Sequence, residues 1–330
     1  MTYLFKISAF KHIDIKSSKT KFFSSVDKGQ IVSFWFKPKI VLNGESIGNK
    51  IEKYVETPNQ LVKDIRNKML EIKSSCFSAD GKSINYKSLK NTEIFTSYLN
   101  LVGQLKYVDL KAFSNSEKKS FYINIYNCLI LHAIIDELLD VNGGTLARMK
   151  LYATASYDIG GAVYSLNDIE NGLLRGNRKS AVPLTSLPFR DESDVRRQFM
   201  LNCDPRIHFA LNCGAVSCPP IGVYSYDEAT LDAELSIATK GFLDQTVVFE
   251  PSKRTVYLSM LFNWYKEDFG GNDENILDWM KNNGSNELKK RFEQFEKEIY
   301  DNNNFIKEPR FGDIKYKIKY SPYDWSVNEL

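Results

Sequence analysis

The stretch SNSEKKSFYINIYNCLILHAIIDELL, residues 114–139, combines a helix start signal with a long apolar run. Ser114 stands three residues before Glu117, which is the spacing of a capping box. Asn124 and His132 lie two four-residue steps apart and therefore share one face of the expected helix. Amide and imidazole groups on such a helix suggest chemistry, although a helix histidine is often a core residue bonded to a neighbouring carbonyl.

Helical patterns precede this stretch, and turns with short strands follow it. We expect helices over 57–76 and within 91–108, then hairpins through Gly160–Gly161 and Pro251–Ser252. Further on, the pattern predicts helices over 227–245, 260–270 and 273–301 and a strand within 313–325. Helices and strands without βα alternation predict an α+β fold: a helix-rich single main domain with a small mixed or antiparallel sheet.

The N-terminal part has a different texture. IVSFWF, residues 31–36, alternates apolar residues as a strand does, and an Asn-Gly turn signal follows at 43–44. We therefore expect residues 1–85 to form a small β-rich N-terminal extension plus a leading helix, without an assigned role. Residues 86–330 are expected to form the main α+β domain with its C-terminal tail.

Composition excludes several classes of partner. The 44 basic and 41 acidic side chains leave a formal charge of +3, so nucleic acid is not expected as a partner. No apolar run reaches the length of a membrane span, and the five scattered cysteines are typical of a reducing compartment where thiols stay free. We therefore expect a cytoplasmic protein. We expect no cofactor, and no phosphate-binding glycine loop is present.

The second informative stretch is DPRIHFALNCGAVSCPPIGVYS, residues 204–225. Its IHFAL segment is expected to be a strand, which would place His208 and Cys213 on opposite faces. A thiol nucleophile needs a base within hydrogen-bond reach, so the expected partner of Cys213 is His132, with His208 as the choice if the strand bulges. Asn124 or Asn212 could orient the imidazole as the third group of a Cys-His-Asn arrangement.

The turn that follows suits an active site. Small residues from Gly214 onward allow close approach, and the stiff turn ending in Pro219–Pro220 could offer free N–H groups to an oxyanion. The alternative is a tight crossing of the chain in which the cysteines act as small hydrophobes. No metal site is predicted, because an extended strand would keep Cys203 far from Cys213, and zinc needs converging ligands.

Four motifs occur together in a characteristic order: FYINIYNCLILHAI, YDIGGAVYSLNDIENGLLRG, DPRIHFALNCGAVSCPP and FNWYKEDFG. In this order they resemble the family known as domain of unknown function 547, over residues from about 90 to 330, and SPYDWSVNEL is similar to a tail seen after that domain. The resemblance implies a mixed helix and strand domain found in bacterial and plant proteins, without an established reaction. It carries over these residues: Asn124, Tyr126, Asn127, His132, Gly160, Gly161, Ile169, Glu170, Arg175, Asp204, Pro205, Phe209, Ala210, Cys213, Trp264 and Asp268.

Departures from the family pattern narrow the candidates. Ala162 and Asn171 stand where members often have histidine, and serine often replaces Cys218, so Cys213 is the better thiol candidate. The predicted catalytic residues are Cys213, His132, His208 and Asn124. The predicted substrate-binding residues are Asn127, Asn212, Gly214, Ser217, Cys218, Arg206 and Glu170.

Two function classes follow. The first is a thiol-dependent hydrolase or acyl transferase that uses a Cys-His pair on a small-molecule or peptide substrate. The second is a non-catalytic protein-interaction or scaffold module, in which the polar helix stripe fixes one packing arrangement. In that case the N-terminal extension or the aromatic C-terminal tail would bind a protein partner.

Overall fold

Helix α7 (Asn115–Ile135) is the centre of the fold in the computed structural model, which describes residues 38–44, 58–140, 144–181, 186–302 and 316–330. The Ser114 hydroxyl accepts the Glu117 N–H while the Glu117 carboxylate accepts the Ser114 N–H, so the predicted capping box is confirmed. From Ser120 onward nearly every residue is buried. A helix that is apolar on all sides is stable only when other elements surround it.

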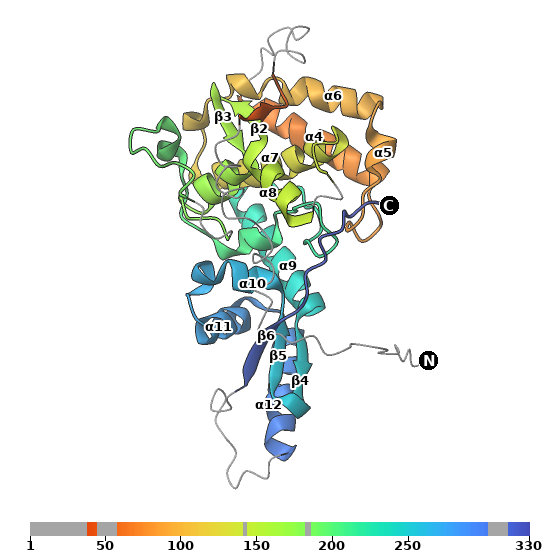
Figure 1. The fold of residues 1–330 in the computed structure, drawn as a ribbon, viewed down its shortest axis with the longest axis vertical. Helices are drawn as coiled ribbons and strands as arrows, with labels where there is room; N and C mark the ends of the chain where they lie inside the picture. Colours follow the sequence, from red (N-terminus) through yellow and green to blue (C-terminus); the bar gives the residue numbers. More distant parts are fainter. Residues whose placement is uncertain (1–37, 45–57, 141–143, 182–185, 303–315) are drawn as a thin grey trace.

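The upper part of Figure 1 holds the elements that surround α7. Helix α4 buries Leu61, Ile65, Met69 and Ile72 in the same core, which confirms the amphipathic pattern read from its sequence. The elements of this part are α4 (Pro58–Cys76), α5 (Tyr86–Leu89), α6 (Glu93–Val102), η2 (Leu105–Tyr107), η3 (Leu110–Ala112), α8 (Gly144–Thr154), η4 (Asp168–Leu174), η5 (Val195–Phe199) and η6 (Pro205–Phe209).

The described residues also form two small three-stranded sheets. In the first, β1 (Ile40–Val41) runs parallel to β2 (Ala155–Ile159), which pairs antiparallel with β3 (Ala162–Ser165). The predicted hairpin between β2 and β3 is confirmed. Gly160 and Gly161 both adopt positive φ, as a two-residue hairpin turn requires, and a Cβ on Gly160 would lie 2.6 Å from the Val108 carbonyl oxygen.

The second sheet belongs to the lower part of the molecule. Strands β4 (Val248–Glu250) and β5 (Thr255–Leu258) form the other predicted hairpin, through η7 (Pro251–Lys253), and β6 (Lys317–Tyr320) joins β5 in parallel. A second hydrophobic cluster lies here. Its helices are α9 (Glu228–Thr246), α10 (Met260–Trp264), η8 (Lys266–Phe269), α11 (Asp273–Asn283) and α12 (Asn286–Asn302).

The helix-rich α+β fold is therefore confirmed, with corrections to two elements. The expected single helix over 273–301 is two helices, because α11 ends at Asn283, with Gly284 as its C-cap, and α12 begins at Asn286. The expected IHFAL strand is wrong: η6 is a 3-10 helix that Asp204 caps and Pro205 starts. The strand predicted at 31–36 lies outside the described residues.

Two further features bear on the site. Ile207 belongs to the cluster around α7 and Phe209 to the lower cluster, so η6 lies at the junction of the two. Among the described residues, no helix has both the length and the apolar character needed to cross a membrane.

Candidate active site

A cavity of about 100 Å³ lies where the two hydrophobic clusters meet. Its wall takes residues from α7, α8, η4 and η6 on one side and from α10 and the C-terminal tail on the other. Aromatic rings form much of this wall. The groups in it that bear on acid-base or thiol chemistry are Arg148, Glu170, His208, Cys213 and Cys218.

His208 and Asp268 form a buried hydrogen-bonded pair at this cavity. His208 Nε2 lies 2.8 Å from Asp268 Oδ2, and the imidazole stacks on the Tyr265 ring with centroids 3.9 Å apart. Burial lowers the pKa of His208, and the bond to Asp268 offsets only part of this effect. Since an ionised carboxylate only accepts, Nε2 carries the proton and Nδ1 keeps its lone pair.

Asp268 stays ionised because cations surround it. Arg175 donates to both carboxylate oxygens, at 2.5 and 3.0 Å, and Arg178 donates to Oδ1 at 2.5 Å. Burial raises the pKa of Asp268, but the hydrogen bonds from His208 and Arg175 outweigh it and hold the pKa well below its usual range. The carboxylate therefore fixes the tautomer of His208 and can stabilise its protonated form.

Glu170 enters the same cavity from η4, which is a π-helix. Its two carboxylate oxygens accept the hydroxyls of Tyr265 at 2.5 Å and Tyr126 at 3.2 Å. Burial, reinforced by the charge of Glu170, raises the pKa of both tyrosines far above the usual value, so both remain donors. Short π-helical segments are frequent at functional sites, where they redirect one side chain.

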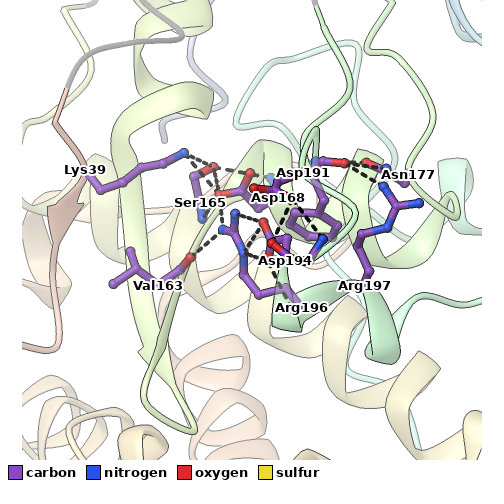
Figure 2. Close-up of polar contacts among 11 residues, drawn as sticks. Lys39, Val163, Ser165, Asp168, Asn177, Asp191, Asp194, Arg196 and Arg197 are labelled. Carbon is purple, nitrogen blue, oxygen red and sulfur yellow. Dashed lines mark hydrogen bonds and ion pairs between the residues drawn. The ribbon is translucent and has the colours of Figure 1, made fainter.

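A polar network fixes the start of η4 (Figure 2). The Asp168 carboxylate accepts Ser165 N–H at 2.9 Å, Ser165 Oγ at 2.8 Å and Lys39 Nζ at 3.1 Å. Arg196 lies 3.6 Å from the same carboxylate and is held in place by Asp194. This network joins Lys39, directly before β1, and the elements β3 and η5 to the segment that carries Glu170.

Cys213 and Cys218 form a disulfide in the cavity wall. The Tyr323 hydroxyl lies 3.4 Å from Cys213 Sγ and 3.2 Å from Cys218 Sγ, and the Cys213 N–H lies 3.0 Å from Cys218 Sγ. The prediction of free thiols is therefore wrong for this pair. Cys76, Cys128 and Cys203 are free, and burial raises the pKa of the Cys203 thiol to about 12.

The predicted partnership of Cys213 with His132 is wrong. His132 Nδ1 bonds to the Tyr157 hydroxyl at 2.9 Å, and Nε2 lies 3.2 Å from Asp136 Oδ2. The imidazole is buried among aromatic rings outside the cavity. His208 shares the cavity instead, because a 3-10 helix does not alternate its faces as a strand would.

In the turn at Gly214–Cys218, four backbone N–H groups already donate to acceptors within the protein, so they are not free to bind an oxyanion. The Gly214 N–H donates to Asn212 Oδ1 and the Cys218 N–H to the Ala215 carbonyl. The N–H groups of Val216 and Ser217 donate to carbonyls of the C-terminal tail, and Ser217 Oγ accepts the Asp324 N–H. The expected oxyanion-binding role of this turn is therefore wrong for these groups.

The remaining predicted residues lie outside the cavity lining. Asn124 bonds to the backbone of Tyr224, and Asn127 accepts the Asn212 N–H and donates to the Ala210 carbonyl. These amides attach the segment that contains both cysteines to α7. Arg206 pairs with Asp204 and Asp232 at the surface.

Several wall residues were missed by sequence reasoning or received no role from it. Arg148, buried beside the turn, donates to the Cys213 carbonyl at 2.9 Å and to the carbonyl of Trp325. The resemblance included Trp264 and Asp268 without a role, and the tail was read as a docking surface. The one sequence signal for Tyr323 was the similarity of SPYDWSVNEL to a tail that follows this domain.

A search of the described residues for three or more His, Cys, Asp or Glu side chains placed to hold a metal ion finds none.

Comparison with known proteins gives one match. Residues 110–243 match the family model described as protein of unknown function, DUF547, which supports the suspected resemblance to this family over that part of the chain. No curated protein and no solved structure matches the chain.

Proposed function

We propose that this protein, which matches the DUF547 family model over residues 110–243, is a thiol-dependent hydrolase or acyl transferase whose nucleophile is Cys213 and whose base is His208. The observation that supports the proposal is that Cys213 and His208 line one cavity while Asp268 accepts the hydrogen bond of His208 Nε2, which leaves Nδ1 as the basic nitrogen. A nucleophile, a base and a group that orients the base are the three parts of a catalytic triad.

Each step then has a residue to perform it. Neutral His208 takes the proton of the Cys213 thiol on Nδ1, and Asp268 stabilises the resulting imidazolium. The thiolate adds to the acyl carbon of a small-molecule or peptide substrate, and the leaving group takes the proton from the imidazolium. Water or an acyl acceptor then attacks the thioester and releases Cys213. Cys213 is the more exposed of the two residues, since Cys218 is 7% exposed.

The disulfide makes activity depend on reduction. A dithiol reductant would convert the Cys213–Cys218 bond into two thiols and become a disulfide itself. We retain a cytoplasmic location as part of the proposal, since a reducing compartment would supply that reductant.

Site-resolved alkylation tests the proposal. The protein is treated with a phosphine reductant and then with limiting iodoacetamide, and each cysteine is followed by peptide mass spectrometry. We expect Cys213 to react at least about tenfold faster than N-acetylcysteine near pH 7, because a neighbouring base lowers the thiol pKa. His208→Gln should remove this advantage, and Cys203 serves as the slow internal reference. A Cys213 that reacts no faster than N-acetylcysteine would contradict the proposal.

The scaffold alternative draws on the packing roles of the α7 residues. Asn124, Asn127 and His132 all satisfy buried partners, as a module with one fixed packing requires. A partner would then bind the N-terminal extension or the tail. Under this alternative, His208→Gln would leave the alkylation of Cys213 unchanged and lower the free energy of unfolding.

A further inference from the structure

The C-terminal tail, residues 321–330, runs from the lower part of the molecule to the upper part (Figure 1). Its residues Tyr323 and Trp325 line the cavity. Directly after β6, the Ser321 N–H donates a hydrogen bond to the Leu258 carbonyl. The tail then accepts backbone hydrogen bonds from the turn that contains the cysteines. Asn328 then donates to the Gly214 carbonyl and accepts the Ile84 N–H. These contacts fix the tail on both sides of the disulfide.

Tyr323 is the tail residue that reaches the sulfur atoms. Its ring packs against Trp264, at 4.8 Å, and Trp325, at 4.6 Å between centroids, and these two rings lie 5.2 Å from each other. This three-ring cluster restricts the direction of the hydroxyl. That hydroxyl lies within 3.4 Å of both sulfurs. Burial raises the pKa of Tyr323 far above its usual value, so the side chain keeps its proton and stays a donor.

We propose that Tyr323 is a catalytic residue that donates a hydrogen bond to the Cys213 thiolate and so favours its formation. The inference rests on the proposed function, because it concerns the nucleophile of that reaction. Other donors near the sulfurs have acceptors of their own: the N–H groups of Gly214, Val216, Ser217 and Cys218 bind carbonyls or Asn212, and Arg148 binds backbone carbonyls. A hydrogen bond to an ionised sulfur is stronger than one to a thiol. The proton of the thiol goes to His208, and Tyr323 retains its own.

The test is the pH dependence of alkylation at Cys213 in the reduced protein, for the wild type and for Tyr323→Phe. Near pH 7 we expect Tyr323→Phe to react about tenfold more slowly than the wild type, with its alkylation curve moved to higher pH. At high pH, where the thiol is fully ionised, the two rates should converge. Tyr107→Phe is the matched control, because Tyr107 is 53% exposed and outside the cavity lining.

The outcomes separate this inference from the proposed function. A wild-type Cys213 with the alkylation curve of N-acetylcysteine overturns both. A low wild-type thiol pKa that Tyr323→Phe leaves unchanged overturns only the role of Tyr323. Near-ultraviolet circular dichroism of each variant checks the packing, and Tyr323→Met, which keeps an apolar side chain without a hydroxyl, should reproduce the effect of Tyr323→Phe.

Discussion

At the scale of the residue, His208 is neutral near pH 7 because burial of the imidazole outweighs its bond to Asp268. Two guanidinium groups already balance the Asp268 charge, so the carboxylate does not need a protonated histidine. A neutral imidazole is the form that can accept a proton from a thiol. The same burial makes the imidazole a source of pH-dependent stability.

The prediction concerns unfolding between about pH 7.5 and pH 5.5. The unfolded chain protonates His208 near pH 6.5, whereas the folded chain resists protonation, so the unfolded state binds more protons and stability falls as the pH drops. We expect the wild type to lose about 1 kcal/mol more than His208→Gln over this range. Urea unfolding measures both losses. Equal losses would show that the folded imidazole titrates like the unfolded one.

At the scale of the element, η4 needs glycine at position 172. A Cβ there would lie 2.5 Å from the Phe189 ring, and Phe189 is fully buried. Gly172→Ala should therefore lower the free energy of unfolding by about 1–3 kcal/mol and displace Glu170 from its two tyrosines. Gly241→Ala in α9, where a Cβ meets nothing within 4 Å, should be neutral or stabilising by up to about 1 kcal/mol. Chemical denaturation measures the free energy of unfolding of both variants. Equal changes in Gly172→Ala and Gly241→Ala would refute the packing argument.

Local sequence signals predicted some elements and failed for others. The capping box at Ser114 and the Gly160–Gly161 turn depend on neighbouring residues, and both are confirmed. The IHFAL segment has the composition of a strand, yet the Asp204 cap and the burial of its residues between two clusters favour a 3-10 helix. A regular IHFAL strand would exclude His208 as the partner of Cys213, because side chains alternate between the two faces of a strand. That exclusion does not hold for a 3-10 helix.

At the scale of the whole molecule, the tail connects the two clusters, and Asn328 is its main attachment. Its side chain accepts the Tyr86 hydroxyl at 2.7 Å and donates to the Lys82 carbonyl at 3.0 Å. Asn328→Ala would leave the buried Tyr86 hydroxyl unpaired, so it should cost about 1–3 kcal/mol and speed hydrogen exchange across residues 321–330. Glu329→Gln removes an exposed ion pair and should change little. Unchanged exchange in Asn328→Ala would contradict this role.

Long-range assembly explains what the sequence could not predict about the site. Cys213 and Glu170 were recognised, but Tyr323 and Arg148 reach the sulfur-bearing turn from segments far away in the chain. Asp268 meets His208 from 60 residues away. No local pattern encodes such contacts, so the residue types of the site were predicted better than their pairing.

The most direct test of the central claim, that Cys213 is an acyl-accepting nucleophile served by His208, is to trap an acyl group on the protein. The reduced and oxidised forms are incubated with p-nitrophenyl acetate, quenched in acid and mapped by peptide mass spectrometry. The account predicts acetylation at Cys213 in the reduced wild type, strong loss of it in His208→Gln, and none at Cys213 in the oxidised form. A reduced protein that carries no acetyl group on Cys213, or that is acetylated equally at Cys203, would contradict it.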